Sequence, residues 1–276
     1  MQFQTAKPQR CILQRHHPHA RGLVAAWPMD DAGGKIVRDA AGTNHGTAAA
    51  DGKWVPGLSG GTAMTFNGSS DWVTGADLAS VNFDGTVPMA MFAWLRALGG
   101  SGSDYFFVAK EANSNQYTGW YALIGNSESG GTYKLSATAA QHNATGHRLS
   151  RVGTNTNFSI GGWHHAGFTY DGSRSSNGII LYVDGGIEPS TSASNTWVSA
   201  QAPSGIPVTI GSRDAGGVKF NGSIHDVRIY NRALSASEVA EISRDPWAIY
   251  RPPGINIYAA TALAHIAAYR QLRRRV

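Results

Sequence analysis

FNGSIHDVRIYNRALSASEVAEI, residues 220–242, carries the strongest fold signal in the chain, because it joins an alternating strand to a well-signalled helix. In a strand, successive side chains point to opposite faces of the sheet. One face would carry Ile224, Asp226, Arg228 and Tyr230, and the other His225, Val227, Ile229 and Asn231. The pattern predicts a strand that can bury one face and leave the other in water.

The helix that follows has a clear start and end. Ser235 stands three residues before Glu238, the capping-box spacing in which a hydroxyl and a carboxylate satisfy free backbone amides. The dipeptide Asp245-Pro246 should end the helix, since proline disfavours the helical conformation in the residue before it.

This segment resembles the closing strand and helix of the laminin G-like, concanavalin A-like lectin and glucanase jelly rolls. Further blocks match that family in the expected order: GLVAAWPMDD (22–31), MTFNGSSDWV (64–73), WHHAGFTYDG (163–172) with IILYVDG (179–185), and VTIGSR (208–213). Several blocks that occur in the family's order are a more specific signal than any single block. The resemblance implies an all-β fold, a two-sheet antiparallel jelly-roll sandwich with one short C-terminal helix and extended terminal arms.

Composition supports an antiparallel β architecture independently of the family. The chain has 34 glycines in 276 residues, about 12% against roughly 7% in average proteins. Turn dipeptides separate its short alternating runs: Asn67-Gly68, Asp84-Gly85, Asp171-Gly172, Asp184-Gly185 and Asn221-Gly222. These residues tolerate positive φ where strands reverse. We expect a basic N-terminal arm (1–21), a jelly-roll domain (22–249) and a basic C-terminal arm (250–276).

The cysteine content and the ends of the chain bear on its location. Cys11 is the single cysteine, so no intramolecular disulfide can form, and its neighbours Ile12 and Leu13 favour a small apolar contact. The N-terminus lacks the apolar run of a secretory signal, and the weakly apolar stretch 258–269 is too short to span a bilayer. The resemblance implies a domain that acts outside cells, yet the chain shows no secretion signal. A component of a virus particle, made in the host cytoplasm, would satisfy both conditions; an extracellular protein is the alternative.

Both arms are basic, with no carboxylate in residues 1–21 or 251–276. Basic arms bind phosphates or dock on acidic protein surfaces. We favour docking on other virion proteins or neighbouring subunits over nucleic acid, because no nucleic-acid-binding motif accompanies the charge. The alternative without a function is a solvated tail that has no partner. The predicted docking residues are Arg10, Arg15, Arg21, Arg251, Arg270, Arg273, Arg274 and Arg275. Residues 258–272 have helical spacing, although 255–258 could instead add a strand.

Catalysis is disfavoured by the distribution of acids. Retaining glycosidases need two carboxyl groups about 5 to 5.5 Å apart, and the glucanases of this fold set theirs on one strand in a Glu-x-Asp-x-x-Glu pattern, which this chain lacks. Asp184 and Glu188 are separated by two glycines that turn the chain. We expect no enzyme activity.

The adjacent histidines His164 and His165 should point to opposite faces of a strand, so we expect one to be packed and the other to be hydrogen-bonded.

The resemblance also implies a calcium ion, which many domains of this family hold near the chain ends. Calcium takes six to eight oxygen ligands, and the opening and closing strands offer Asp30 and Asp226, with Asp39 as a third candidate. The structural alternative is that Asp226 pairs with Arg228 or caps a turn.

Sugar binding would use aromatic rings and a few polar groups. Trp27, Trp94 and Trp163 lie in strand blocks and are expected in the core. The predicted glycan-binding residues lie beside Gly, Asn and Ser: Trp72, Tyr117, Trp120, Tyr121 and Trp197. The preferred segment is 117–131.

The sequence therefore predicts a non-enzymatic structural protein of a bacteriophage virion, serving as a capsid decoration, fibre or tail component. Its lectin-like jelly roll would act in assembly, stabilisation or host adhesion, as an oligomer or assembly subunit. A carbohydrate-binding module of a secreted or surface protein is the alternative, followed by a glycoside hydrolase.

Overall fold

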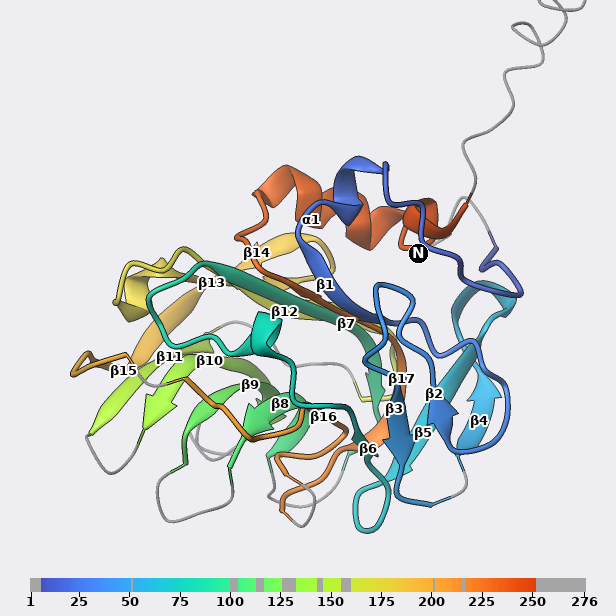
Figure 1. The fold of residues 1–276 in the computed structure, drawn as a ribbon, viewed down its shortest axis with the longest axis horizontal. Helices are drawn as coiled ribbons and strands as arrows, with labels where there is room; N and C mark the ends of the chain where they lie inside the picture. Colours follow the sequence, from blue (N-terminus) through green and yellow to red (C-terminus); the bar gives the residue numbers. More distant parts are fainter. Residues whose placement is uncertain are drawn as a thin grey trace, which may run out of the picture.

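The structure is a computed structural model that describes residues 6–50, 52–99, 104–112, 117–125, 133–142, 146–154, 160–200, 202–214 and 217–251. Over these residues the chain forms two antiparallel sheets stacked face to face, with one α-helix on the outer side of one sheet (Figure 1). The predicted all-β jelly-roll sandwich is confirmed.

The eight-stranded sheet, counted over the described residues, contains the opening and closing strands of the chain. Its order is β14 (Gly186–Glu188), β13 (Ile179–Val183), β12 (His164–Tyr170), β7 (Met89–Ala97), β17 (Asn221–Tyr230), β5 (Thr62–Asn67) and β4 (Lys53–Pro56), with β1 (Leu23–Trp27) also paired to β17. The predicted central hairpin is β12 paired with β13.

The nine-stranded sheet, again over the described residues, holds the middle of the chain. Its order is β15 (Ser190–Thr196), β11 (His147–Gly153), β10 (Lys134–His142), β9 (Gly119–Gly125), β8 (Tyr105–Glu111), β16 (Thr209–Ile210), β6 (Val73–Thr74), β3 (Gly46–Ala48) and β2 (Ile36–Val37). The block MTFNGSSDWV therefore crosses from β5 in one sheet to β6 in the other.

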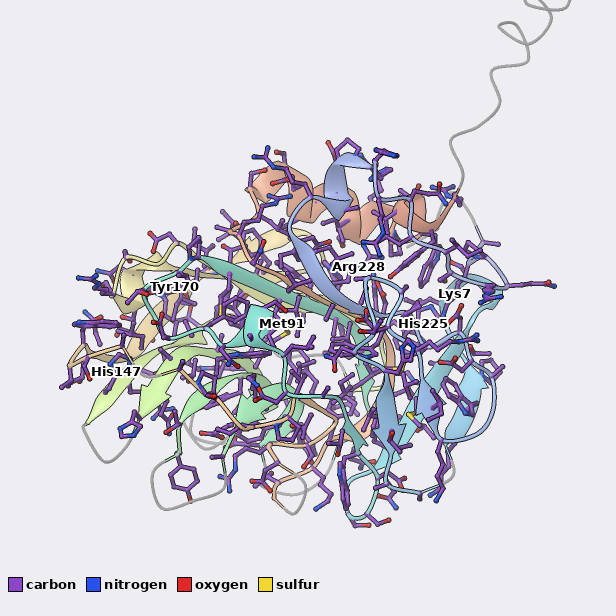
Figure 2. The ribbon with its side chains drawn as sticks, in the orientation of Figure 1. Lys7, Met91, His147, Tyr170, His225 and Arg228 are labelled. Carbon is purple, nitrogen blue, oxygen red and sulfur yellow. The ribbon has the colours of Figure 1, made fainter. Side chains whose placement is uncertain are left out.

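The core lies between the sheets, where alternate side chains of both meet. Met91 of β7 is one of these fully buried side chains (Figure 2). Trp27 and Trp94 are buried as predicted, whereas Trp163 is only half-buried and stacks under the Arg96 guanidinium at 5.4 Å.

Strand β17 contains a β-bulge that its sequence pattern does not reveal. Ile224 pairs with Leu95 and Asp226 with Trp94, so His225 is an extra residue. As a result Ile224 and Val227 both face the core, and the prediction that Ile224 and Asp226 share a face was wrong.

The outer face of β17 is buried rather than exposed to water. Asp226 and Arg228 are 3% and 1% exposed, because the N-terminal segment and the C-terminal helices cover this side of the sheet (Figure 1). Figure 2 shows Lys7, His225 and Arg228 gathered on the same side of the molecule.

Helix α1 (Ala236–Arg244) begins and ends where the sequence predicted. Ser235 Oγ accepts the Glu238 amide, and Glu238 accepts the Ser235 amide, which completes the capping box. The helix places Val239 and Ile242 against Tyr230 on the sheet.

Short 3₁₀ helices complete the described structure: η1 (Pro18–Ala20), η2 (Leu58–Gly60), η3 (Ala79–Val81), η5 (Ser176–Gly178) and η6 (Ala248–Tyr250). In the described part of the chain, no helix has the length and apolar character needed to cross a membrane.

Residues 6–21 of the predicted N-terminal arm pack on their own chain. Lys7 is 8% exposed, and its ammonium donates to the carbonyls of Met29 and Thr62 at 3.1 and 3.0 Å and also to that of Pro28. Cys11 is buried beside Trp247, which confirms its predicted apolar contact. These residues therefore contact their own chain, and docking of the arm on neighbouring subunits stays a prediction.

The turn dipeptides behave as predicted with one exception. Asp184-Gly185 joins β13 to β14 with φ values of 52° and 84°, which separates Asp184 from Glu188 as expected. Asn221-Gly222 instead lies inside β17, where Gly222 has φ 149° and a Cβ atom would lie 2.1 Å from the Arg96 carbonyl. This glycine permits a close approach of two backbones rather than a reversal.

Candidate functional site

The candidate site lies on the outer face of the nine-stranded sheet, the face turned away from the core. Along strand β9 the alternation sends Trp120, Ala122 and Ile124 into the core. It sends Tyr121 and Leu123 to the outer face, where they pack with Phe106 of β8.

A row of side chains crosses this face in register. Ala109 of β8 pairs with Tyr121 of β9, and Tyr121 pairs with Thr138 of β10. Thr138 pairs with Ser150 of β11, and Ser150 with Ser194 of β15. Five strands thus align an aromatic ring with three hydroxyl side chains across the sheet.

Two hydroxyls of this row have no hydrogen-bond partner among the described residues. Thr138 and Ser150 are each 1% exposed, and within the described chain neither Thr138 Oγ1 nor Ser150 Oγ finds a hydrogen-bond partner. Buried polar atoms are nearly always hydrogen-bonded to protein, water or a ligand. These two hydroxyls are therefore buried polar groups whose hydrogen-bonding capacity the described residues leave unused.

Tyr121 is fixed at one end of the row by polar contacts. Its phenol oxygen accepts from Arg148 Nη2 at 2.9 Å and lies 3.4 Å from Gln141 Oε1. Its ring lies 5.0 Å from that of Phe106, with an interplanar angle of 56°. The orientation of the ring is thus set from both its edge and its face.

A buried carboxyl group, Glu111, lies at the end of β8 on the same face. Its Oε2 is 3.8 Å from Arg213 Nε, and Asp214 Oδ2 is 3.3 Å from the same nitrogen. Burial is the main reason that the pKa of Glu111 rises to about 7; the Asp214 charge raises it further, while Arg213 and Arg148 act in the opposite direction. Near neutral pH this carboxyl can therefore either donate or accept a hydrogen bond.

Arg213 also joins two aromatic residues at the edge of the site. Its guanidinium lies 5.0 Å from the ring centre of Tyr117 and 5.9 Å from that of Phe106. Such a cation–π contact holds a half-buried ring such as Tyr117 in place. Of the five predicted glycan-binding residues, Tyr117 and Tyr121 are the two that reach this face.

The other three predicted glycan-binding residues lie elsewhere. Trp120 has no exposed surface and donates its indole N–H to the Val81 carbonyl at 2.8 Å, so its assignment to an open face was wrong; strand alternation turns it inward. Trp72 lies under the Lys219 ammonium at 5.2 Å. Trp197 packs against His147 at 4.7 Å.

The three predicted calcium ligands are engaged by the protein itself. Asp39 accepts the amides of Ala26 and Ala41 with Oδ1 and that of Asn44 with Oδ2. Asp30 Oδ2 accepts the Cys11 amide at 2.6 Å.

Asp226, the third, pairs with Arg228 at 2.7 Å, as the structural alternative predicted. In the described ranges no group of three His, Cys, Asp or Glu side chains is arranged to hold a metal. The three aspartates are thus held by hydrogen-bond donors of the protein itself, and calcium stays a prediction.

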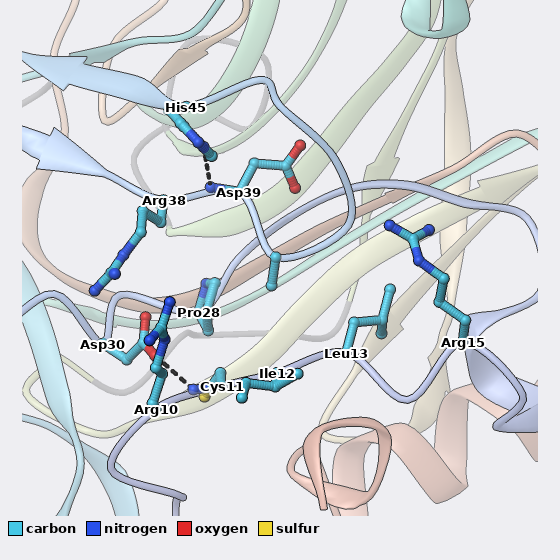
Figure 3. Close-up of a pocket in the computed structure, with 11 residues that line it drawn as sticks. Arg10, Cys11, Ile12, Leu13, Arg15, Pro28, Asp30, Arg38, Asp39 and His45 are labelled. Atoms are coloured by element: carbon cyan, nitrogen blue, oxygen red, sulfur yellow. Dashed lines mark hydrogen bonds between the residues drawn. The ribbon is translucent and has the colours of Figure 1, made fainter.

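Four of the eight predicted docking arginines lie in the described part of the chain, and four lie outside it. Arg10 and Arg15 line a cleft (Figure 3). Arg21 is exposed and accepts from Arg232 Nε through its carbonyl oxygen, and Arg251 pairs with Asp245. Arg270, Arg273, Arg274 and Arg275 lie outside the described residues, as does the whole of 252–276.

The histidine pair on β12 behaves as predicted. His165 is 2% exposed and stacks on Phe92 at 5.2 Å. His164 Nδ1 instead lies 2.8 Å from Asp184 Oδ2. Burial lowers the pKa of His165 to about 3.

Sequence reasoning missed Thr138, Ser150 and Glu111. The alternation of Leu135, Ala137 and Ala139 with polar residues in β10 marks the face that Thr138 occupies. Ser150 had no comparable signal, since its position depends on the pairing of β11 with β10.

Two stacked antiparallel sheets, one with an aromatic and hydroxyl-bearing outer face, define a lectin-like jelly-roll domain with a carbohydrate-binding fold. Residues 67–240 match a laminin G-type family model described as the concanavalin A-like lectin/glucanases superfamily. The chain belongs to this family.

Solved structures share the fold at low sequence identity. A Trypanosoma rangeli sialidase in complex with sialic acid is 15% identical with a TM-score of 0.58, over 84% of this chain and 34% of that one. The binding domain of Paraclostridial Mosquitocidal Protein 1 is 16% identical with a TM-score of 0.60, over 81% of this chain and 52% of that one.

Domain 4 of AbnA, a GH43 extracellular arabinanase from Geobacillus stearothermophilus, in complex with arabinotriose, is 17% identical with a TM-score of 0.55, over 80% of this chain and 98% of that one. The present chain spans about a third of the sialidase and about half of the mosquitocidal binding domain. At sequence identities of 15 to 17%, these comparisons show that the fold is shared. No curated protein matches the sequence.

Proposed function

We propose that this protein is a non-catalytic glycan-recognition domain whose ligand binds along the outer face of the nine-stranded sheet. The observation that carries the proposal is a pair of buried hydroxyls, Thr138 Oγ1 and Ser150 Oγ, beside the Tyr121 ring. Neither has a hydrogen-bond partner in the described part of the chain. Sugars present hydroxyl groups around an apolar ring face, so they match a row that combines hydroxyls with an aromatic side chain.

The test is glycan binding by variants that lose only a hydroxyl. Thr138→Val and Ser150→Ala keep the side-chain volume nearly constant, and we expect each to weaken binding about fivefold to tenfold, the cost of one neutral hydrogen bond. The screening panel includes arabinotriose and sialyllactose, because related folds were solved with arabinotriose and with sialic acid.

The matched control is Thr47→Val in β3, an exposed threonine near the opposite edge of the same sheet, on a strand that the row does not cross. It should bind like the wild type. A glycan that binds Thr138→Val and Ser150→Ala as tightly as the wild type would contradict the proposed site. If no glycan of a full glycan array binds the wild-type protein, glycan recognition itself is contradicted.

A glycoside hydrolase is the second candidate, because Glu111 combines a pKa of about 7 with a neighbouring carboxylate, Asp214. Hydrolysis needs one protonated and one ionised carboxyl on either side of the scissile bond. Glu111 and Asp214 are only 3% and 8% exposed and both approach the Arg213 guanidinium, an arrangement that favours binding over catalysis. Release of reducing sugar that Glu111→Gln abolishes would replace the proposal with hydrolysis.

The basic arms support a further proposal, attachment to a phage particle as a decoration, fibre or tail component. Five arginines without a carboxylate in 251–276 suit an acidic protein surface. The full-length protein and a variant lacking 252–276 would be sedimented with capsids and with tails at two salt concentrations. Saturable binding that needs this segment supports the role, whereas a free monomer under all conditions contradicts it.

A further inference from the structure

A cleft of about 370 Å³ opens between the N-terminal segment and the chain that follows β1. Arg10 and Arg15 lie on one wall, and Arg38, Asp39 and His45 lie on the other (Figure 3). The volume falls within the roughly 300 to 1,000 Å³ that is typical of small-molecule sites. Its lining shares no residue with the hydroxyl row of the nine-stranded sheet, so a ligand site in this cleft is independent of the proposed glycan site.

The three guanidinium groups keep hydrogen-bond donors for a ligand. Arg10 is exposed, and no hydrogen bond or ion pair joins its guanidinium to any described residue. Arg15 uses Nη2 to donate to the Ala41 carbonyl at 3.0 Å, and Arg38 uses Nε to bind Asp31 at 2.6 Å. Each guanidinium carries five N–H donors, so most of them remain available.

The two carboxylates in the lining are occupied by backbone amides. Asp30 Oδ2 accepts the amide of Cys11, and both oxygens of Asp39, which is 4% exposed, accept amides. Their negative charge is therefore partly compensated by N–H dipoles within the wall. The arginine side chains are the charged groups that reach furthest toward solvent.

His45 adds a further hydrogen-bond donor to the same cleft. Its Nδ1 accepts the Asp39 amide at 3.1 Å. A ring nitrogen that accepts a backbone amide carries no proton, so in the neutral ring the proton is on Nε2. The exposed His45 thus offers an N–H donor.

We propose that this cleft binds the oxyanion group of a small ligand, a carboxylate, sulfate or phosphate attached to a body about the size of one or two sugar rings. Guanidinium forks match the paired oxygens of these groups. Ile12 and Leu13 supply apolar surface for the body of the ligand. The N-terminal segment forms one wall, so the site exists only while residues 10–15 lie on the sandwich.

The test is isothermal titration of the full-length protein with glucuronate, glucose 6-sulfate, glucose 6-phosphate and neutral glucose, and with inorganic sulfate and phosphate. We expect at least one charged sugar to bind and glucose not to bind. Arg10→Gln and Arg38→Gln should each weaken binding about tenfold to a hundredfold, the range for hydrogen bonds to a charged group. The affinity should also fall as sodium chloride is raised.

Arg174→Gln is the matched control, because Arg174 is exposed and stacks on Trp197 away from the cleft. It should leave the affinity unchanged. Binding of sulfate or phosphate alone with the same dependence on Arg10 would support the oxyanion site and assign the affinity to the anion. Absence of binding by all the anions, or binding that both cleft variants leave unchanged, would overturn the proposal.

Discussion

Arg228 Nη2 lies 2.7 Å from Asp226 Oδ2 on the covered outer face of β17, where the two side chains are only 2% and 4% exposed. Tyr250 adds a hydroxyl 3.3 Å from Asp226 Oδ1, and its ring centre lies 5.3 Å from the Arg228 guanidinium. The closing strand is therefore joined to the C-terminal 3₁₀ helix through a buried ion pair.

Arg228→Met should lower the free energy of unfolding by about 3 to 5 kcal/mol, because it leaves the Asp226 carboxylate buried without its partner. The double variant Arg228→Met with Asp226→Leu should recover most of that loss, since it removes both charges. Urea denaturation measures both. Equal stability of the single and double variants would show that the unpaired charge is not the cause.

Lys7→Met should also destabilise the protein, by about 1.5 to 3 kcal/mol, because it removes a charged donor from the buried carbonyls of Met29 and Thr62. It should loosen the N-terminal segment and expose Cys11, whose buried thiol has a raised pKa and should react slowly. The measurement is the rate of maleimide labelling of this single cysteine.

Gln9→Met is the control for Lys7→Met, because Gln9 is exposed two residues away. It should label at the wild-type rate. Equal labelling of Lys7→Met and wild type would mean that Lys7 does not hold the segment down.

Thr138→Val should leave the free energy of unfolding unchanged or raise it by up to about 1 kcal/mol, because its buried hydroxyl has no partner among the described residues. Thr209→Val should instead lower it by about 1 to 3 kcal/mol, since Thr209 Oγ1 donates to the Ser212 carbonyl at 2.8 Å. Thermal and urea unfolding compare these two buried threonines of one sheet. A large loss in Thr138→Val would indicate that its hydroxyl is satisfied within the protein.

Glu238 should make stability depend on pH between about 5 and 2. Hydrogen bonds from Arg232 are the main reason that its pKa falls from 4.5 to about 2 in the folded protein. A depressed folded-state pKa stabilises the protein above the unfolded value of 4.5, and this contribution is lost as the pH falls toward 2.

Glu238→Gln keeps an oxygen for the capping box but cannot ionise. We expect its unfolding free energy to change less than that of the wild type over this pH interval. Parallel curves for the two proteins in urea titrations at several pH values would contradict the assignment to Glu238.

Which parts of this molecule were predictable depends on the range of the forces involved. The ends of α1 depend on Ser235, Glu238 and Pro246, all within a few residues of the helix, so the sequence predicted them. The hairpin turn at Asp184-Gly185 is equally local. The inward position of Trp120 was missed because the neighbouring glycines were taken as signs of a loop, although the residue lies in a regular strand.

Alternation, turn residues and capping act over short distances, so these local signals were enough to predict an antiparallel sandwich. The bulge at His225, the covering of β17 by residues 6–21 and the pairing of Thr138 with Ser150 were visible only in the folded protein. The folded protein also brings Arg10 and Arg38 to one cleft. Each of these depends on pairing register or on contacts between segments far apart in the chain, and a one-residue change of register would turn every side chain to the other face.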